Sequence, residues 1–370
     1  MPHKIKKIFY ENLTFEKLLA AHQRARKGKA TKNNVIQFEM NLENNLTNLL
    51  NQLRIGTYHI GAYRSFIILE PKKREIESLP YVDRIVHQWY VEEFIKPYIL
   101  PKFIKDTYAC IPDRGTHHAV DAVQHYMQIY HRKKEDFWVL KCDIRKFFYS
   151  IDRSVLFEIL KKHIGDKALL RFTYHLLEDN RNGRSLGIPI GNYTSQFFAN
   201  IYLNELDQYI KHELRIKYYV RYMDDFILLL DTKADCKFIL EQIRSFLKSY
   251  LKLELNEKSR YYPCHMGINF CGYRIWPTHR LLRTNSKRKM KKKISKWNHL
   301  FHNGTLDYKR VLPTFNSWMG HISHCNSYKL KQHLLKKIDF LYETYEPFPL
   351  EENLTEINSI EEDITNDLNL

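Results

Sequence analysis

The segment YYVRYMDDFILLL, residues 218–230, sets two adjacent aspartates, Asp224 and Asp225, between two apolar and aromatic runs. Aspartate is among the poorest strand-forming residues, so the pattern predicts a β-hairpin with both acids at its turn. Neighbouring side chains of a continuous strand point to opposite faces, so the two acids can serve one site only if the backbone reverses there. The alternative is an ordinary polar turn between two buried strands.

A third aspartate, Asp143, has a similar setting earlier in the chain. It ends a short apolar segment at 136–142, and a helix is expected at about 153–162. A loop with Gly and Pro at 186–191 and a long helix expected at 194–214 then lead to the hairpin. This order is typical of a split β-α-β-β sheet, in which the strand that ends at Asp143 can lie beside the hairpin.

Three carboxylates that converge repel one another by ~1–4 kcal/mol per pair at a separation of about 4 Å. Divalent cations offset such repulsion, and all-oxygen ligands suit Mg²⁺. Two such ions clamp the attacking and leaving oxygens of a phosphoryl transfer. The residues alone therefore predict a metal-dependent phosphoryl or nucleotidyl transferase that acts on nucleic acid.

The charge of the chain also indicates a polyanionic partner. The formal net charge is +17; residues 346–370 contain eight acids and no Lys or Arg, so the remaining residues carry +25. A basic surface kept for solubility is the alternative to nucleic-acid binding. The six cysteines lack metal-ligand spacing and are expected to be reduced thiols of a cytoplasmic protein. No apolar run is long enough to span a membrane, and no signal peptide is evident.

Other segments add cationic features. Residues 1–60 are expected to be helical, with a basic segment at 24–32 that is either a nucleic-acid contact or a solvated loop. A hairpin of residues 63–69 and 75–77 follows. Three cations at its tip are suited to a triphosphate: Lys72, Lys73 and Arg74. Further helices are expected at 233–251, from Ser286 onward with a basic outer face, and at 327–345, and a strand at 253–255. The acidic tail is expected to be disordered.

Over residues 60–345 these features resemble the reverse transcriptases. The matching motifs, as they stand here, are Lys73-Arg74, Asp83-Arg84 with Gln88, YACIP (108–112), GTH (115–117), KCDIRKFF (141–148), IPIGNYTSQ (188–196), YMDD (222–225), Lys258 and FCGY (270–273). The resemblance implies an α+β right-hand polymerase fold. Its expected parts are an N-terminal extension with fingers (1–135), a palm with an antiparallel sheet (136–280, with a finger-associated insertion at about 155–190), a helical thumb (281–345) and the tail (346–370).

The resemblance also implies residue roles. Asp143 and Asp224 would bridge two Mg²⁺ ions, or Mn²⁺ in their place, with Asp225 more peripheral and the Ile144 backbone carbonyl as a further ligand. Lys258 would be the acid for the leaving pyrophosphate. The incoming dNTP would contact Lys72, Lys73, Arg74, Phe148, Ile190 and Gln196, with Phe148 as the steric gate against a 2′-hydroxyl. Primer and template would contact Arg84, Tyr222, Phe270, Gly272, Tyr273, Lys287 and Lys291.

The loop before the long helix resembles that of one group within the reverse transcriptases. Most reverse transcriptases carry Gln-Gly and then Ser-Pro there, whereas this chain has Ile190-Gly191 and Ser195-Gln196. The variant is similar to the enzymes of diversity-generating retroelements, which copy a template-repeat RNA and misincorporate opposite adenines; GINFCGYRIWPTH (267–279) and WMGH (318–321) resemble the same group. An amide at position 190 could hydrogen-bond the nucleotide, and its loss costs ~0.5–1.5 kcal/mol, or up to about tenfold in discrimination. Ile190 as a packing choice is the alternative.

The implied partners are template RNA, cDNA, dNTPs and a small basic helical-bundle accessory protein that can be oligomeric. The nearest alternative function is a defence-associated or retron-like reverse transcriptase that copies a noncoding RNA. A catalytically silent RNA-binding scaffold is an alternative of another class, and the three intact aspartates argue against it because buried carboxylates are costly. The acidic tail has three possible roles: docking on the accessory protein, screening the thumb, or none.

Overall fold

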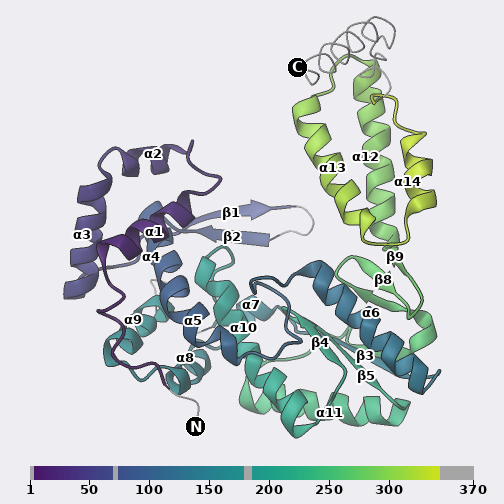
Figure 1. Cartoon of the computed structure of the whole chain (residues 1–370), viewed down its shortest axis with the longest axis horizontal. Helices are drawn as coiled ribbons and strands as arrows, with labels where there is room; N and C mark the ends of the chain where they lie inside the picture. The colour runs from purple at the N-terminus through teal and green to yellow at the C-terminus, as the bar shows by residue number, and fades with distance from the viewer. Residues whose placement is uncertain (1–3, 70–73, 179–185, 342–370) are drawn as a thin grey trace, which may run out of the picture. The chain divides into compact units, whose positions relative to one another are not determined.

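The computed structural model describes residues 4–69, 74–178 and 186–341 (Figure 1). The predictions made for Lys72, Lys73 and the tail 346–370 lie outside these residues. The chain divides into two compact units, Met1–Cys271 with Ile275–Thr278, and Gly272–Arg274 with His279–Leu370.

The N-terminal part of the first unit is helical, as predicted. Its elements are α1 (Phe15–Arg26), α2 (Asn33–Glu39), α3 (Leu42–Ile55), the hairpin strands β1 (Arg64–Ile68) and β2 (Arg74–Ser78), α4 (Tyr81–Tyr90), a π-helical turn (Val91–Ile95) and α5 (Lys96–Tyr98). In the hairpin, Ile68 pairs with Arg74, so Arg74 is the first residue of β2 rather than a residue of the turn.

A four-stranded antiparallel sheet forms the centre of the first unit. Its strands are β3 (Trp138–Asp143), β4 (Tyr219–Tyr222), β5 (Asp225–Leu230) and β6 (Arg260–Pro263), in the order β4-β5-β3-β6. The strand that ends at Asp143 therefore lies directly beside the hairpin, as the split β-α-β-β order predicted. The register sets Asp143 opposite Asp225 and the buried Leu140 opposite the buried Leu228. The expected strand at 253–255 is wrong: Leu255 forms only an isolated bridge with Ile144, and β6 is the neighbour of β3.

Two described helices that contact this sheet are α6 (Thr116–Lys133) and α11 (Lys233–Tyr250) (Figure 1). The described helices between β3 and β4 in the chain are α7 (Phe147–Ser150), α8 (Arg153–His163), α9 (Lys167–Glu178) and α10 (Tyr193–Gln208) with a π-helical extension (Tyr209–Glu213). The helices expected at 153–162, 194–214 and 233–251 are confirmed. The sequence did not predict α6, because its buried residues, such as Val123 and Met127, are separated by His, Gln and Tyr.

The second unit contains the helices α12 (Thr284–His302), α13 (Tyr308–Ser323) and α14 (Tyr328–Leu335), packed around Met290, Ile294, Trp297, Phe315 and Leu334. The sequence did not predict α13, and α14 ends well before Tyr345. The chain leaves the helix after Leu335, and the buried Ile338 and Phe340 then pack into the same core. A three-stranded sheet has the strand order β7 (Ile268–Phe270), β8 (Tyr273–Ile275) and β9 (Arg280–Leu282).

The described residues confirm the α+β class, with helices around antiparallel sheets. All six cysteines are free thiols, as expected. Across the described ranges, no helix combines the length and the apolarity needed to cross a bilayer.

The capping box of α11 gives a stability prediction. The Thr232 hydroxyl accepts from Asp235 N at 3.1 Å, and Asp235 Oδ2 accepts from Thr232 N at 3.0 Å. Thr232→Ala removes the first bond and should lower the free energy of unfolding by about 1 kcal/mol in a urea titration. Ser245→Ala, at an exposed position in the same helix, is the control; equal stability of the two variants would contradict the prediction.

Candidate active site

The end of β3 and the β4–β5 turn form the candidate active site. Asp143 is the last residue of β3 and pairs with Asp225, the first residue of β5. Met223 has φ +56°, in the left-handed region, which reverses the chain and puts Asp224 in the turn itself. Asp143 and Asp224 are close enough for the charge of one to affect the ionisation of the other.

Asp224 is a perturbed acid. Burial is the main cause that raises the pKa of Asp224 from 3.8 to about 6, and the charge of Asp143 adds to the increase. The charge of Asp225 acts in the same direction, while the positive charge of Arg74 opposes it. Two carboxylates held together at this cost are a donor set that suits a divalent cation such as Mg²⁺.

Asp225 is held differently. The Lys141 ammonium donates to both carboxylate oxygens of Asp225 at 2.6 Å, and it lies 5.4 Å from the centroid of the Phe270 ring. Among the residues that the structure describes, no three His, Cys, Asp or Glu side chains are grouped so as to hold a metal ion. The charges of Asp143 and Asp225 both raise the pKa of Asp224, so the three aspartates lie near one another at this end of the sheet. Lys141, on the same face of β3 as Asp143, forms an ion pair with Asp225. The role of the three aspartates as metal ligands stays a prediction.

Sequence reasoning missed the polar support of Asp143. The Asn256 amide donates to Asp143 Oδ2 at 3.0 Å, and the Ser259 hydroxyl accepts from Asp143 N at 3.2 Å. Lys258, the predicted acid, is exposed on this same loop, and its backbone N–H bonds to Asn256 Oδ1 at 3.1 Å. The sequence offered one indication of this support, namely the polar residues Asn256 and Ser259 close to Lys258.

The loop before α10 is hydrogen-bonded to the β1–β2 hairpin. Glu77 N donates to the Ile190 carbonyl at 3.0 Å, next to Gly191 with φ +135°. A Cβ at Gly191 would lie 2.6 Å from the Glu77 carbonyl oxygen, so only glycine permits this approach. The half-exposed Ile190 adjoins a pocket of about 340 Å³, which Gly191, Gln196 and Arg84 line together. The structure thus brings together one predicted dNTP contact and one predicted template contact.

Three other predicted site residues are Phe148 for the nucleotide, Ile144 for the metal ions and Tyr222 for the primer and template. Phe148 is half-buried beside Phe147, with ring centroids 5.6 Å apart. The Ile144 carbonyl follows directly on Asp143, and the Tyr222 hydroxyl accepts from Thr116 at 3.2 Å.

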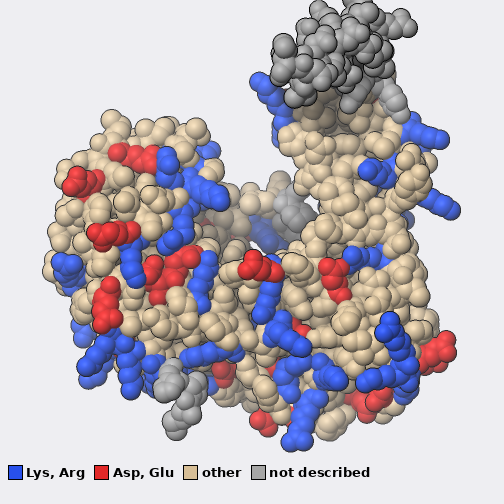
Figure 2. All heavy atoms as spheres, in the orientation of Figure 1, with Lys and Arg blue, Asp and Glu red and all other residues tan. Residues whose placement is uncertain are grey.

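The predicted primer contacts fall in both units. Phe270, in the first unit, is buried. Tyr273, in the second, is buried and donates to the His321 carbonyl at 2.7 Å, and a Cβ at Gly272 would lie 3.0 Å from His321 Nε2. A primer contact at Gly272 and Tyr273 therefore has to use the backbone. Lys287 and Lys291 lie on α12, and Figure 2 shows a few separate Lys and Arg side chains that project from this helical unit.

Comparison with known proteins identifies the family. The sequence pattern described as reverse transcriptase (RNA-dependent DNA polymerase) matches residues 70–275, more than half of the chain. The chain belongs to the reverse transcriptase family. The match includes β2, the whole four-stranded sheet and the turn with Asp224, so the α+β right-hand fold predicted from the sequence is the fold of its family.

Similar proteins include the Putative COX1/OXI3 intron 2 protein of Saccharomyces cerevisiae, 26% identical over 37% of this chain and 24% of that protein. Protein YkfC of Escherichia coli is 25% identical over 61% and 70% of the two chains. The Group II intron-encoded protein LtrA of Lactococcus lactis subsp. cremoris is 23% identical over 63% and 50%. This reverse transcriptase thus spans between a quarter and 70% of these relatives. The solved structure of apo telomerase from Candida tropicalis, truncated from the C-terminal domain, is 13% identical over 63% and 58%, with a TM-score of 0.44.

Removing the charge of Asp224 should stabilise the metal-free protein at pH 7. The free energy of unfolding of Asp224→Asn should exceed that of the wild type by about 1–3 kcal/mol, since one pKa unit corresponds to about 1.4 kcal/mol. Because the pKa of Asp224 is raised in the folded protein, the wild type loses stability as the pH rises through about 6. The free energies of unfolding of the two proteins should converge below about pH 4, where the side chain at position 224 is uncharged in both.

Thermal unfolding in chelator-treated buffer from pH 4 to pH 8 measures this difference. Glu241→Gln, at an exposed acid of α11, is the control and should follow the wild type. A wild type as stable as Asp224→Asn at pH 7 would contradict the electrostatic picture of the site.

Proposed function

We propose that this chain is the RNA-directed DNA polymerase of a diversity-generating retroelement, which copies a template-repeat RNA into cDNA with errors opposite adenines. The observation that carries the polymerase activity is the pair Asp143 and Asp224, placed together by the β3–β5 register and the Met223 turn. The retroelement assignment is supported by Ile190-Gly191 and Ser195-Gln196 and by the segment 267–279, which resemble that group.

Asp143 and Asp224, with the backbone carbonyl of Ile144, would hold two magnesium ions, or manganese ions in their place. The raised pKa of Asp224 supports this fit, because a cation would offset both its burial and the charge of Asp143. Magnesium supplies a Lewis acid for the phosphoryl group that is transferred. Asp225, bound by Lys141, would have a supporting place beside the pair.

The chain's own residues would then position the substrates. Lys72, Lys73 and Arg74 would bind the triphosphate, and the effect of Arg74 on the pKa of Asp224 is consistent with that place. Phe148 would leave no room for a ribose 2′-hydroxyl. Lys258 would donate a proton to the leaving pyrophosphate.

Template RNA and the growing cDNA would contact the basic surfaces of the protein. The residues proposed for these contacts are Arg84, Tyr222, Phe270, Gly272, Tyr273, Lys287 and Lys291. A small basic helical-bundle accessory protein and a cytoplasmic location complete the proposal. Flanking DNA with an imperfect repeat pair that differs at adenines would separate this function from that of a retron-like or defence-associated enzyme.

Extension of a DNA primer annealed to an RNA template, with dNTPs and Mg²⁺, tests the polymerase activity. Asp143→Asn and Asp224→Asn should each lower the extension rate by about 10²–10⁴-fold, because each removes a charge that the transferring phosphoryl group requires. Asp136→Asn, at an exposed acid before β3, is the matched control and should leave the rate unchanged. No wild-type extension on any template, including the native RNA, would favour the scaffold instead.

Sequencing the cDNA tests the role of Ile190 in base selection. Ile190→Gln offers a hydrogen bond at the edge of the pocket and should lower errors opposite template adenines by up to about tenfold. Ile190→Leu keeps an alkyl group and should keep the wild-type error frequency. An unchanged frequency in Ile190→Gln would reduce Ile190 to a packing residue.

A further inference from the structure

Arg221 directly precedes Tyr222 and the catalytic turn, and its side chain is completely buried. Its guanidinium forms a two-pronged ion pair with Asp207 of α10: Nε to Oδ1 at 2.7 Å and Nη2 to Oδ2 at 2.6 Å. Both side chains have no exposed surface. A buried ion pair is weak evidence for stability, because desolvation of two charges opposes their attraction. Stability alone therefore does not explain why Arg221 and Asp207 are buried together.

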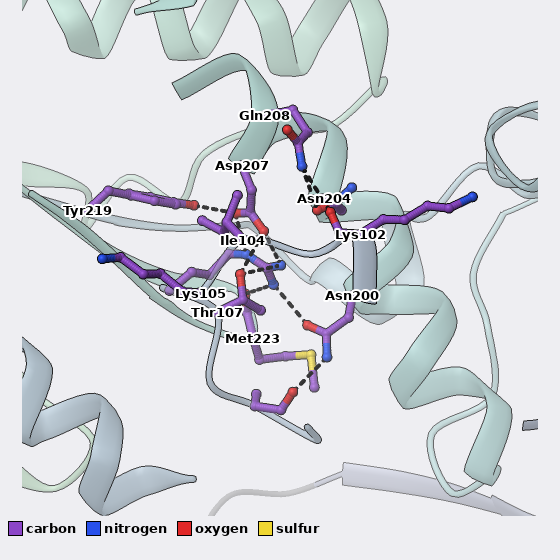
Figure 3. A network of polar contacts seen from close by, with 12 residues as sticks. Lys102, Ile104, Lys105, Thr107, Asn200, Asn204, Asp207, Gln208, Tyr219 and Met223 are labelled. Atoms are coloured by element: carbon purple, nitrogen blue, oxygen red, sulfur yellow. Dashed lines mark hydrogen bonds and ion pairs between the residues drawn. The ribbon is translucent and has the colours of Figure 1, made fainter. Parts of the chain in front are cut away.

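The acid of this pair has additional donors. Tyr219 donates to Asp207 Oδ1 at 2.7 Å, and Thr107 donates to Asp207 Oδ2 at 2.8 Å. Figure 3 shows these side chains converging on Asp207 from the neighbouring strand and loop. The carboxylate of Asp207 is thereby fixed from several sides, which in turn fixes the plane of the guanidinium.

The remaining nitrogen of Arg221 reaches the turn. Nη1 donates to the Met223 carbonyl at 3.0 Å and to Asn200 Oδ1 at 3.0 Å. Asn200 also lies on α10, and its amide donates to the Ala109 carbonyl at 2.7 Å (Figure 3). Met223 is the residue with φ +56°, and its carbonyl belongs to the peptide that leads into Asp224. One buried side chain thus connects α10 to the peptide bond that carries Asp224.

We propose that Arg221 is a positioning residue for nucleotidyl transfer: by holding the Met223 carbonyl against α10, it fixes the place of Asp224 relative to Asp143. This inference rests on the proposed polymerase function. Because α10 also begins directly after the Ile190–Gly191 loop, the same contact keeps the turn in register with the side of the nucleotide site that this loop forms. A displacement of about 1 Å in such a site costs up to about 10²-fold in rate.

Variants of the pair separate positioning from stability. Arg221→Met and Asp207→Asn each leave one buried charge without its partner and should lower the Tm. Arg221→Met/Asp207→Asn removes both charges and leaves an amide for Tyr219 and Thr107, so its Tm should recover above both single variants. The Met223 carbonyl still lacks its donor, so kcat for single-nucleotide incorporation per folded molecule should remain about 10–100-fold below the wild type, with KM for dNTP within about twofold.

Arg221→Lys is the second variant, because it keeps a cation beside Asp207 and folds without an uncompensated charge. Its single nitrogen cannot serve Asp207, Asn200 and the Met223 carbonyl together, so the same loss of kcat is expected. Arg153→Met is the matched control: Arg153 is a buried arginine that donates to the Leu177 carbonyl at 2.7 Å, and its loss should lower Tm without changing kcat per folded molecule.

The outcomes are distinguishable. A wild type without extension overturns the polymerase function itself. An active wild type together with a wild-type kcat in the double variant or in Arg221→Lys shows that Arg221 serves stability alone and overturns the positioning role. A low kcat in the double variant and in Arg221→Lys, together with a wild-type kcat in Arg153→Met, supports the positioning role of Arg221.

Discussion

The repulsion between Asp143 and Asp224 is the constraint on which the rest of the site depends. Burial and, to a lesser extent, the nearby charge of Asp143 raise the pKa of Asp224 to about 6, so the two acids would move apart if the backbone allowed it. The ladder between β3 and β5 prevents this from one side, because it pairs Asp143 with Asp225. The left-handed turn at Met223 prevents it from the other. Many of the hydrogen bonds around the site keep this unfavourable pair of carboxylates in place.

That support comes from several segments that are distant in the sequence. Asn256 and Ser259 are hydrogen-bonded to Asp143, while Lys141 forms an ion pair with Asp225. The hairpin strand β2 contributes through Glu77, which bonds to the Ile190 carbonyl in the loop that starts α10. A polymerase has to align a nucleotide, a primer end and metal ligands. In the first unit, Arg221 connects the turn that carries Asp224 to α10, the helix that follows the Ile190 loop.

The sequence predicted those features that local pattern determines. The aspartates between apolar runs gave the β4–β5 hairpin, and the order of strand, helix and hairpin placed Asp143 beside it. The pairing of Lys141 with Asp225 could not be predicted in this way, because it depends on the register between two strands more than eighty residues apart. Arg221 was missed for a similar reason: it looks like one polar residue in a strand, and its partner Asp207 lies in a helix whose facing is set by tertiary packing. In α6 the buried apolar residues alternate with several His and Tyr residues, and α13 contains Pro313 inside the helix, where proline is unfavourable.

Direct measurement of metal binding tests the central claim that Asp143 and Asp224 together form a divalent-cation site. Mn²⁺ titration of the protein with primer, RNA template and dNTP, followed by electron paramagnetic resonance, reports bound ions independently of turnover. The account predicts bound Mn²⁺ in the wild type and in Asp136→Asn, and loss of at least one bound ion in both Asp143→Asn and Asp224→Asn. Equal Mn²⁺ binding in all four proteins would contradict it.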